Sequence, residues 1–186
     1  MCKCTCQVSR EDNTTVVTDV CENKECSKYI VHSIHFITED ASRALLSQLS
    51  ESCKHASVVV YDPIAQYDAF GEVMEKHLVS AGMADAHTSL LQTRTLEQQL
   101  KKLTDCGFEV AVGCDMWSAY ETVLTDEQRV RANRCELLDE LEEWKLLMQH
   151  YCLAVGSSVS SGFCEVGHSS PMRFMPGKSS ILRKES

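Results

Sequence analysis

The chain has 186 residues, a formal net charge of -9 and 44% hydrophobic residues, which fits one domain with a sizeable core. The acidic balance argues against a general nucleic-acid binder, because neutralising phosphates requires a surplus of Lys and Arg. No apolar run approaches the roughly 20 residues that span a bilayer. The residues after Met1 are polar and do not resemble a secretory signal. We therefore predict a cytoplasmic protein that has neither a nucleic-acid nor a membrane partner.

The chain contains eleven cysteines, and their positions divide them into two groups. One group lies in or beside apolar segments, where a free thiol behaves as a small buried hydrophobe: Cys53, Cys106, Cys114, Cys135 and Cys152. The other group lies near the N-terminus: Cys2, Cys4, Cys6, Cys21 and Cys26. Thiolates bind zinc, but this spacing is not that of a zinc finger and no histidine pair completes it. Reduced thiols on a flexible arm are favoured over a metal site.

In chain order, the polar and aperiodic residues 1–27 predict a flexible arm. Residues 28–37 are rich in β-branched and aromatic side chains, which indicates a short strand or, alternatively, a helical turn. Thr38 and the two acids after it form an N-cap pattern for a helix over residues 39–52. The continuous apolar run at residues 57–61 is the clearest strand in the chain and is typical of a buried parallel sheet.

The second half of the chain continues the alternation. Asp68 can cap a helix with an apolar stripe, and Gly82 provides a left-handed stop. After a linker at residues 83–93, Thr95 opens another helix and Gly107 closes it. The remaining expected segments are a strand at residues 108–112, short helical pieces at 115–133, a helix from 139 that runs directly into a strand at 150–155, and a disordered tail at 157–186.

This order of strands and helices predicts an α/β domain with a mixed sheet over residues 28–156. The stripe expected on the helix after Asp68 consists of Phe70, Val73, Met74, His77, Leu78 and Ala81.

Searches for motifs that carry chemistry find little. The sequence has no Gly-x-Gly-x-x-Gly, P-loop, Gly-x-Ser-x-Gly or His-Glu-x-x-His. The acids between Asp139 and Glu143 point to different sides of a helix, so a solvated face is the favoured interpretation. Asp62 and Asp68 flank a short loop after a buried strand, where open α/β sheets bind ligands, although helix capping by itself explains Asp68. The histidines at positions 32, 35, 77 and 150 are interpreted as core or surface residues.

The stretch from Val59 to Val155 resembles the C-terminal half of the leucine carboxyl methyltransferases. In the family an aliphatic strand ends in Tyr-Glu, and here the strand ends in Tyr61-Asp62. The segments that carry the resemblance are Val60-Tyr61-Asp62, Asp68 to Met74, Gly107 to Ala111 with Asp115-Met116 and Tyr120, and Asp139-Glu140-Leu141 through His150-Tyr151-Cys152-Leu153. The resemblance implies the C-terminal portion of a class I S-adenosylmethionine-dependent methyltransferase with a Rossmann-like mixed sheet.

Members of this family use S-adenosylmethionine to methylate the C-terminal leucine carboxylate of the catalytic subunit of type 2A protein phosphatases. The resemblance therefore implies a methyltransferase, with S-adenosylmethionine as cofactor and the C-terminal tail of that subunit as partner. A carboxylate is already ionised at neutral pH, so such an enzyme needs no general base or metal and mainly aligns donor and acceptor. A sister branch acts in wybutosine synthesis on transfer RNA with an added β-propeller, for which this chain has no room.

The resemblance also implies site residues. Lys28 occupies the place of a lysine in the family's N-terminal arm that helps to bind the cofactor, and Phe36, Tyr61, Asp62 and Asp68 would support the pocket. The family's glycine-rich turn and its acidic residue for the ribose hydroxyls are absent, and another cofactor-binding Glu is replaced by Val31. The chain thus resembles the arm joined to the C-terminal half, without the central cofactor-binding part. The alternative is a non-catalytic phosphatase-interacting module or a degenerate fragment of the family.

Overall fold

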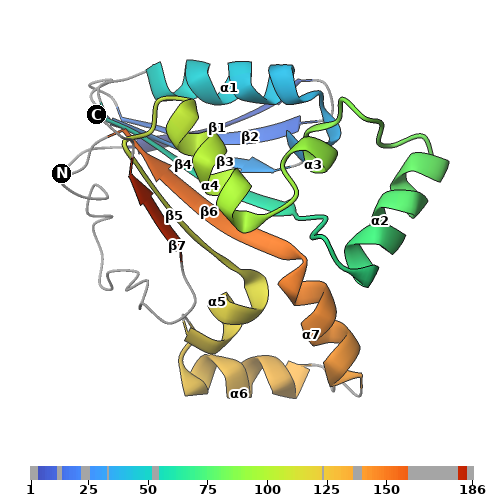
Figure 1. The fold of residues 1–186 in the computed structure, drawn as a ribbon. Helices are drawn as coiled ribbons and strands as arrows, with labels where there is room; N and C mark the ends of the chain where they lie inside the picture. The colour runs from blue at the N-terminus through green and yellow to red at the C-terminus, as the bar shows by residue number, and fades with distance from the viewer. Residues whose placement is uncertain are drawn as a thin grey trace.

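The computed structural model describes residues 4–11, 14–21, 26–32, 34–51, 55–122, 124–135, 140–158 and 180–183. These residues form one mixed seven-stranded sheet with helices around it (Figure 1). The strands are β1 (Cys4–Glu11), β2 (Thr14–Cys21), β3 (Cys26–His32), β4 (His55–Pro63), β5 (Val110–Asp115), β6 (Tyr151–Ser157) and β7 (Ser180–Arg183).

The helical elements of the described residues begin with η1 (Ile34–Phe36), a single turn of 3-10 helix. The α-helices are α1 (Glu39–Glu51), α2 (Ala69–Ser80), α3 (Ser89–Gln92), α4 (Leu96–Asp105), α5 (Met116–Thr122), α6 (Asp126–Cys135) and α7 (Leu141–Gln149). In the part of the chain that the structure describes, no helix is long and apolar enough to cross a membrane.

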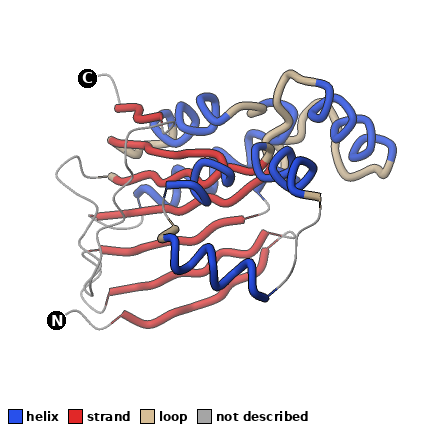
Figure 2. The backbone as a smooth tube through the Cα atoms, turned by 90° about the horizontal axis from the view of Figure 1, so that it is seen from below, coloured by secondary structure: helices blue, strands red, loops and turns tan. Residues whose placement is uncertain are grey.

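The sheet order is β1-β2-β3-β4-β6-β5-β7. β3 and β4 are parallel, with Val31 opposite Val60, whereas β6 lies between β4 and β5 and is antiparallel to both. Figure 2 shows the strands side by side. The sequence analysis predicted a strand directly after the acidic helix, and β6 confirms it. One further strand, β7, pairs with β5.

Helices α1 and α4 cover one face of the sheet, and this face holds the core. Val58 and Val60 of β4 point toward that face because side chains alternate along a strand. They join a buried cluster with Leu46 of α1 and with Leu100 and Leu103 of α4. Helices α5, α6 and α7 gather below the sheet in Figure 1, away from α1.

The sequence signals for helix ends are confirmed. The backbone nitrogen of Gly71 donates to Asp68 Oδ1 at 2.8 Å, so Asp68 is the N-cap of α2. Thr95 and Gln98 form a capping box at the start of α4. Gly82 and Gly107 follow α2 and α4 with φ of 69° and 103°, a left-handed conformation that glycine adopts without steric cost.

Other expectations differ from the structure. The expected strand at 108–112 is shifted: β5 begins at Val110, and Phe108 packs in the core beside Gly156, where an added Cβ would lie 2.9 Å from the Phe108 ring. The linker at 83–93 contains the short helix α3. Residues 28–37 form the end of a strand and a 3-10 turn. Strands β1 and β2 lie in the region expected as a flexible arm and β7 in the expected tail, and the sequence analysis predicted none of them.

A buried ion pair between Lys102 and Glu39 joins the helices that cover the core. Lys102 of α4 is 0% exposed, and its Nζ donates to Glu39 Oε2 at 2.9 Å and to Ser89 Oγ at 2.7 Å. Burial lowers the pKa of Lys102 against the opposing effect of Glu39. Burial by itself would raise the pKa of Glu39, but the hydrogen bond and charge of Lys102 outweigh it, so that pKa is lowered. This ion pair connects α1, α3 and α4.

We predict that Lys102→Ala destabilises the protein by roughly 3 kcal/mol, because it leaves the Glu39 carboxylate without its buried partner. Urea unfolding measures the change. The matched control is Lys101→Ala, since Lys101 is exposed and its pair with Asp105 lies at the surface; this variant should change stability by less than about 0.5 kcal/mol. Equal losses in both variants would contradict the role assigned to the buried pair.

Candidate functional site

The candidate site lies where the parallel strands β3 and β4 end at the same edge of the sheet. The register pairs His32, the last residue of β3, with Tyr61 near the end of β4. The turn η1 follows β3, and residues 64–68 connect β4 to α2. This edge is where open α/β sheets bind ligands. It contains four of the five predicted site residues, Phe36, Tyr61, Asp62 and Asp68.

A buried His–Asp pair joins the two loops at this edge. His35 Nδ1 lies 2.8 Å from Asp62 Oδ1, and Asp62 is 3% exposed. Strand alternation turns Asp62 toward the covered face, the side of Val60. The Asp62 carboxylate is therefore used to hold η1 against the end of β4. His35 was interpreted as an ordinary core or surface residue, and it is buried.

The two aromatic residues at this edge are exposed. Tyr61 is 42% exposed, points to the face opposite Asp62, and stacks on Tyr151 with ring centroids 5.6 Å apart. Burial and the neighbouring Tyr151 and Cys152 raise the pKa of Tyr61, which keeps the phenol protonated at neutral pH. The Phe36 ring lies against the His35 ring, with centroids 3.9 Å apart. Both aromatic surfaces are accessible to a ligand.

A second His–Asp pair joins the loop after β4 to the start of β6. His150 is 1% exposed, and its Nε2 lies 3.1 Å from both carboxylate oxygens of Asp68. Its Nδ1 lies 2.8 Å from the carbonyl oxygen of Leu146 in α7. The backbone hydrogen bond from Gly71, and then the hydrogen bond and charge of His150, hold the pKa of Asp68 below its ordinary value. Asp68 therefore caps α2 and binds His150 with the same carboxylate.

A cavity of about 240 Å³ opens beside this pair. Polar side chains from the loop after β4, the end of β5 and the end of α7 surround it: Gln66, Asp68, Asp115, Gln149 and His150, with Leu146 as the apolar member. Gln66 Nε2 donates to the Gln149 carbonyl at 2.7 Å. Asp115 accepts from the backbone nitrogen and the hydroxyl of Ser118 at 2.7 and 2.8 Å. The cavity is polar and lies between segments that are distant in the sequence.

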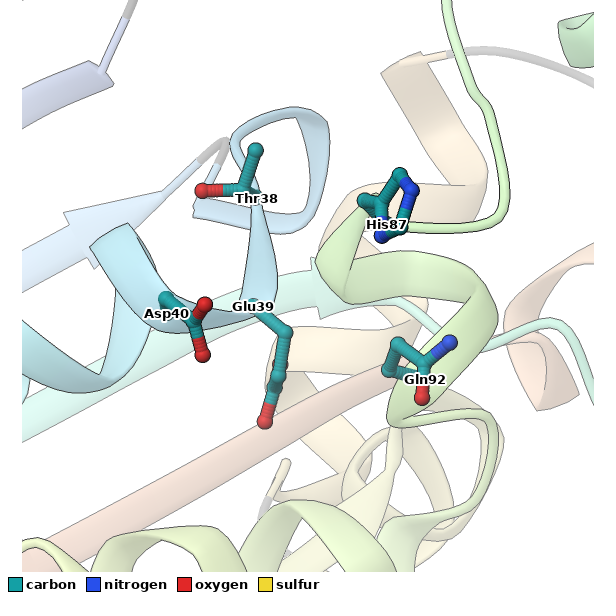
Figure 3. A pocket seen from close by; sticks show the side chains of 5 residues that line it. All are labelled: Thr38, Glu39, Asp40, His87 and Gln92. Carbon is teal, nitrogen blue, oxygen red and sulfur yellow. The ribbon is translucent and has the colours of Figure 1, made fainter.

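A larger cavity of about 370 Å³ lies at the start of α1. Figure 3 shows Thr38 with Glu39 and Asp40, the first residues of α1, on one side and His87 and Gln92 from the segment around α3 on the other. The Glu39 carboxylate is already paired with Lys102 and with Arg43, whose Nε lies 2.7 Å from Oε1. We therefore interpret this cavity as a surface hollow above a structural ion pair.

The fifth predicted site residue, Lys28, lies away from this edge. It is the third residue of β3 and pairs with Ser57 of β4, whereas the site lies beyond His32 at the other end of the strand. At about 3.3 Å per residue, the Lys28 backbone is roughly 13 Å from that end. The structure does not describe the Lys28 side chain. The proposed role of Lys28 in cofactor binding thus has no support from the position of its backbone.

The cysteines inside the domain are mostly inert. Cys106, Cys114 and Cys152 are buried as predicted, while Cys135 is exposed and the Cys53 side chain is outside the described residues. Burial raises the pKa of Cys114 to about 11 and that of Cys152 to about 12, which disfavours the reactive thiolate. Among the described side chains, no group of three or more His, Cys, Asp or Glu is placed to hold a metal ion. The side chains of the N-terminal cysteines lie outside that set.

The acidic helix gives a mixed result. Glu140, Glu142 and Glu143 are exposed, which confirms the solvated interpretation. Leu141, an apolar residue of the same helix, is also exposed, at 57%. His150 of this segment lines the polar cavity, and the sequence analysis did not select it as a site residue. The available signal was its position at the junction of a helix and a strand.

We predict that Asp62→Ala destabilises the protein by roughly 1–3 kcal/mol, because it removes the hydrogen-bond partner of the buried His35 ring. Asp62→Asn keeps an acceptor oxygen and should cost less. Thermal or urea unfolding measures both. Asp40→Ala serves as the control at an exposed carboxylate, with an expected change within about 0.5 kcal/mol. If Asp62→Ala unfolds with the same midpoint as the wild type, the pair does not hold the two loops together.

The comparisons with known proteins agree with the family resemblance found in the sequence. No family model matches the chain. Leucine carboxyl methyltransferase 1 of Schizosaccharomyces pombe is 36% identical over 107 residues, which are 55% of this chain and 33% of that protein. The homolog of Arabidopsis thaliana is 32% identical over 131 residues, 68% of this chain and 38% of that protein. Leucine carboxyl methyltransferase 1 of Caenorhabditis elegans is 29% identical over 149 residues, 80% of this chain and 40% of that protein.

These matches confirm the resemblance predicted from the sequence. Each match covers only part of the length of the relative. The chain spans about a third of the length of the curated relatives it matches. The mixed α/β sheet, the two His–Asp pairs and the cavity beside His150 lie within the described residues. The chain is a relative of the leucine carboxyl methyltransferases, matched over a region that corresponds to about a third of those proteins.

Proposed function

We propose that this chain carries the C-terminal part of an S-adenosylmethionine-dependent leucine carboxyl methyltransferase of class I architecture. Its acceptor would be the C-terminal leucine carboxylate of the type 2A protein phosphatase catalytic subunit. The supporting observation is the insertion of β6 between β4 and β5, antiparallel to both, beside the parallel pair β3 and β4. The printed names of the relatives support the reaction class.

The described residues do not form a complete cofactor site. A nucleotide-type cofactor needs a carboxylate for its ribose hydroxyls and backbone N–H groups of a glycine-rich turn. At the carboxyl end of β4, Asp62 is buried against His35, and Asp68 is bound to Gly71 and His150. The sequence has no Gly-x-Gly-x-x-Gly. The cofactor therefore remains a proposal that rests on the relatives, and we assign it no contacts.

The chemistry that these residues can support is the placement of an acceptor. A leucine carboxylate is ionised at neutral pH and needs no base in the site, so aligning it is the main requirement. The exposed rings of Phe36 and Tyr61 offer apolar surface for the leucine side chain. The contact between Asp68 and His150 fixes the loop after β4 beside the cavity. We propose these residues as supports of the acceptor pocket.

We expect S-adenosylhomocysteine to bind this chain alone only weakly, with a dissociation constant on the order of 10⁻⁴ M or higher. Isothermal titration calorimetry measures the affinity, and the physical reason is the lack of the glycine-rich turn and the ribose carboxylate. Adenosine serves as the control ligand for unspecific binding. Micromolar affinity for S-adenosylhomocysteine would show that another part of the chain provides the cofactor site.

The activity itself is tested with a peptide that ends in the phosphatase leucine and with tritiated S-adenosylmethionine. Transfer of label to the free-acid peptide, but not to the same peptide with an amidated C-terminus, would support the proposed reaction. The incomplete cofactor site favours a second candidate function, a non-catalytic module that binds the phosphatase. Association of the phosphatase subunit with the chain, without label transfer, would favour this second function. The lack of both results would contradict both functions.

A further inference from the structure

Helix α2 is held to the rest of the protein at its N-terminal end and, in its middle, by an ion pair in which Arg94 Nη2 donates to Glu75 Oε2 at 2.7 Å. Gly71 is its buried residue, and a Cβ there would lie 1.9 Å from the Gln66 carbonyl oxygen. Farther along the helix, Val73 is 49% exposed and Val79 is 47% exposed. The apolar stripe expected on this helix is therefore exposed at Val73. Figure 1 shows α2 projecting from the edge of the sheet at the right.

His150 contacts this end of α2. Its ring lies against the Phe70 ring, with centroids 4.3 Å apart, and its Nε2 meets the Asp68 carboxylate. The other ring nitrogen is also held, because Nδ1 lies 2.8 Å from the Leu146 carbonyl oxygen of α7. The backbone carbonyl of His150 accepts from Ile64 of the loop after β4. His150 thus joins α7, β6 and the loop that leads into α2.

The two hydrogen bonds of the ring require a particular protonation state. A carbonyl oxygen and a carboxylate oxygen both accept, so both ring nitrogens must donate. A neutral imidazole carries one N–H, and either tautomer would place a nitrogen lone pair against an oxygen at 2.8 or 3.1 Å. Because the pKa of Asp68 is lowered and its carboxylate is ionised at neutral pH, the doubly protonated ring is the form that satisfies both contacts. The ring is 1% exposed, so water cannot replace the lost hydrogen bond without movement.

We propose that His150 is a positioning residue of the candidate site: as an imidazolium it seats the N-terminal end of α2 and Asp68 beside the cavity, and loss of its proton releases them. The charged groups that line the same cavity among the described residues are Asp68 before α2 and Asp115 at the end of β5. Both are carboxylates, and the Asp68 carboxylate contacts the ring. The inference rests on the proposed function only for the pocket that the seated helix would border.

Hydrogen exchange and histidine NMR test this proposal on the whole chain, from about pH 5 to about pH 9. Long-range proton–nitrogen spectra report whether both nitrogens of His150 carry protons. Over the interval in which the ring loses its proton, the protection factors of the α2 amides should fall by roughly tenfold per pH unit. The amides of α4, a helix on the covered face that does not contact His150, provide the internal reference.

Variants separate the charge of the ring from its packing. His150→Gln keeps a donor for Asp68 but cannot titrate, so its α2 protection factors should not depend on pH. Asp68→Asn keeps an acceptor for the N-cap and removes the charge, and it should likewise abolish the dependence. His77→Gln changes an exposed histidine of α2 and should behave as the wild type. A purely structural role of His150 would lower protection at all pH values and leave the pH dependence unchanged.

The proposal is overturned if the wild-type α2 amides show no loss of protection as the ring titrates, or if His150→Gln retains the wild-type pH dependence. A ring that is neutral over the whole range overturns it as well. None of these measurements requires methyl transfer. A chain that shows the pH-dependent seating but neither modifies nor binds the phosphatase peptide would keep this inference and contradict the proposed function.

Discussion

The structure depends on the insertion of β6 between β4 and β5. Antiparallel pairing on both sides gives this strand a full set of backbone hydrogen bonds and fixes its register, with Val155 opposite Val59 on one side and Val112 on the other. A slip by one residue would turn its buried side chains to the other face. Because the register is fixed, His150 at the start of β6 must lie beside the end of β4.

Charged side chains serve mainly to join elements in this fold. Lys102 and Glu39 connect three helices over the core, His35 and Asp62 connect the loops after β3 and β4, and His150 and Asp68 connect α7 to α2. Each pair is at least partly buried, where an ionic or hydrogen-bonded partner is costly to remove. The exposed aromatic rings at the same edge are the surface left for a ligand. The candidate site thus combines two His–Asp pairs, exposed aromatic rings and a polar cavity beside His150.

This arrangement suits the proposed acceptor role better than a complete enzyme site. The carboxylates that could hold a ribose are already engaged, and the relatives are matched over about a third of their length. In the proposed function, the described residues serve to position the acceptor. An enzyme that methylates an ionised carboxylate depends on alignment more than on acid–base groups, and the proposed function is consistent with a sequence that has no motif for acid–base chemistry.

The sequence by itself determined the local features and the family. Caps at Asp68 and Thr95, stops at Gly82 and Gly107, the apolar run of β4 and the helix–strand junction at His150 were readable, because each depends on residues within one turn or one strand. Asp62 and Asp68 were expected to flank the loop after that strand, and they do. Only the tertiary structure decided that Asp62 turns inward to His35, that His150 binds Asp68, 82 positions away, and that β1 and β2 join the sheet. Those features depend on pairing between distant segments, for which the local pattern carries no signal.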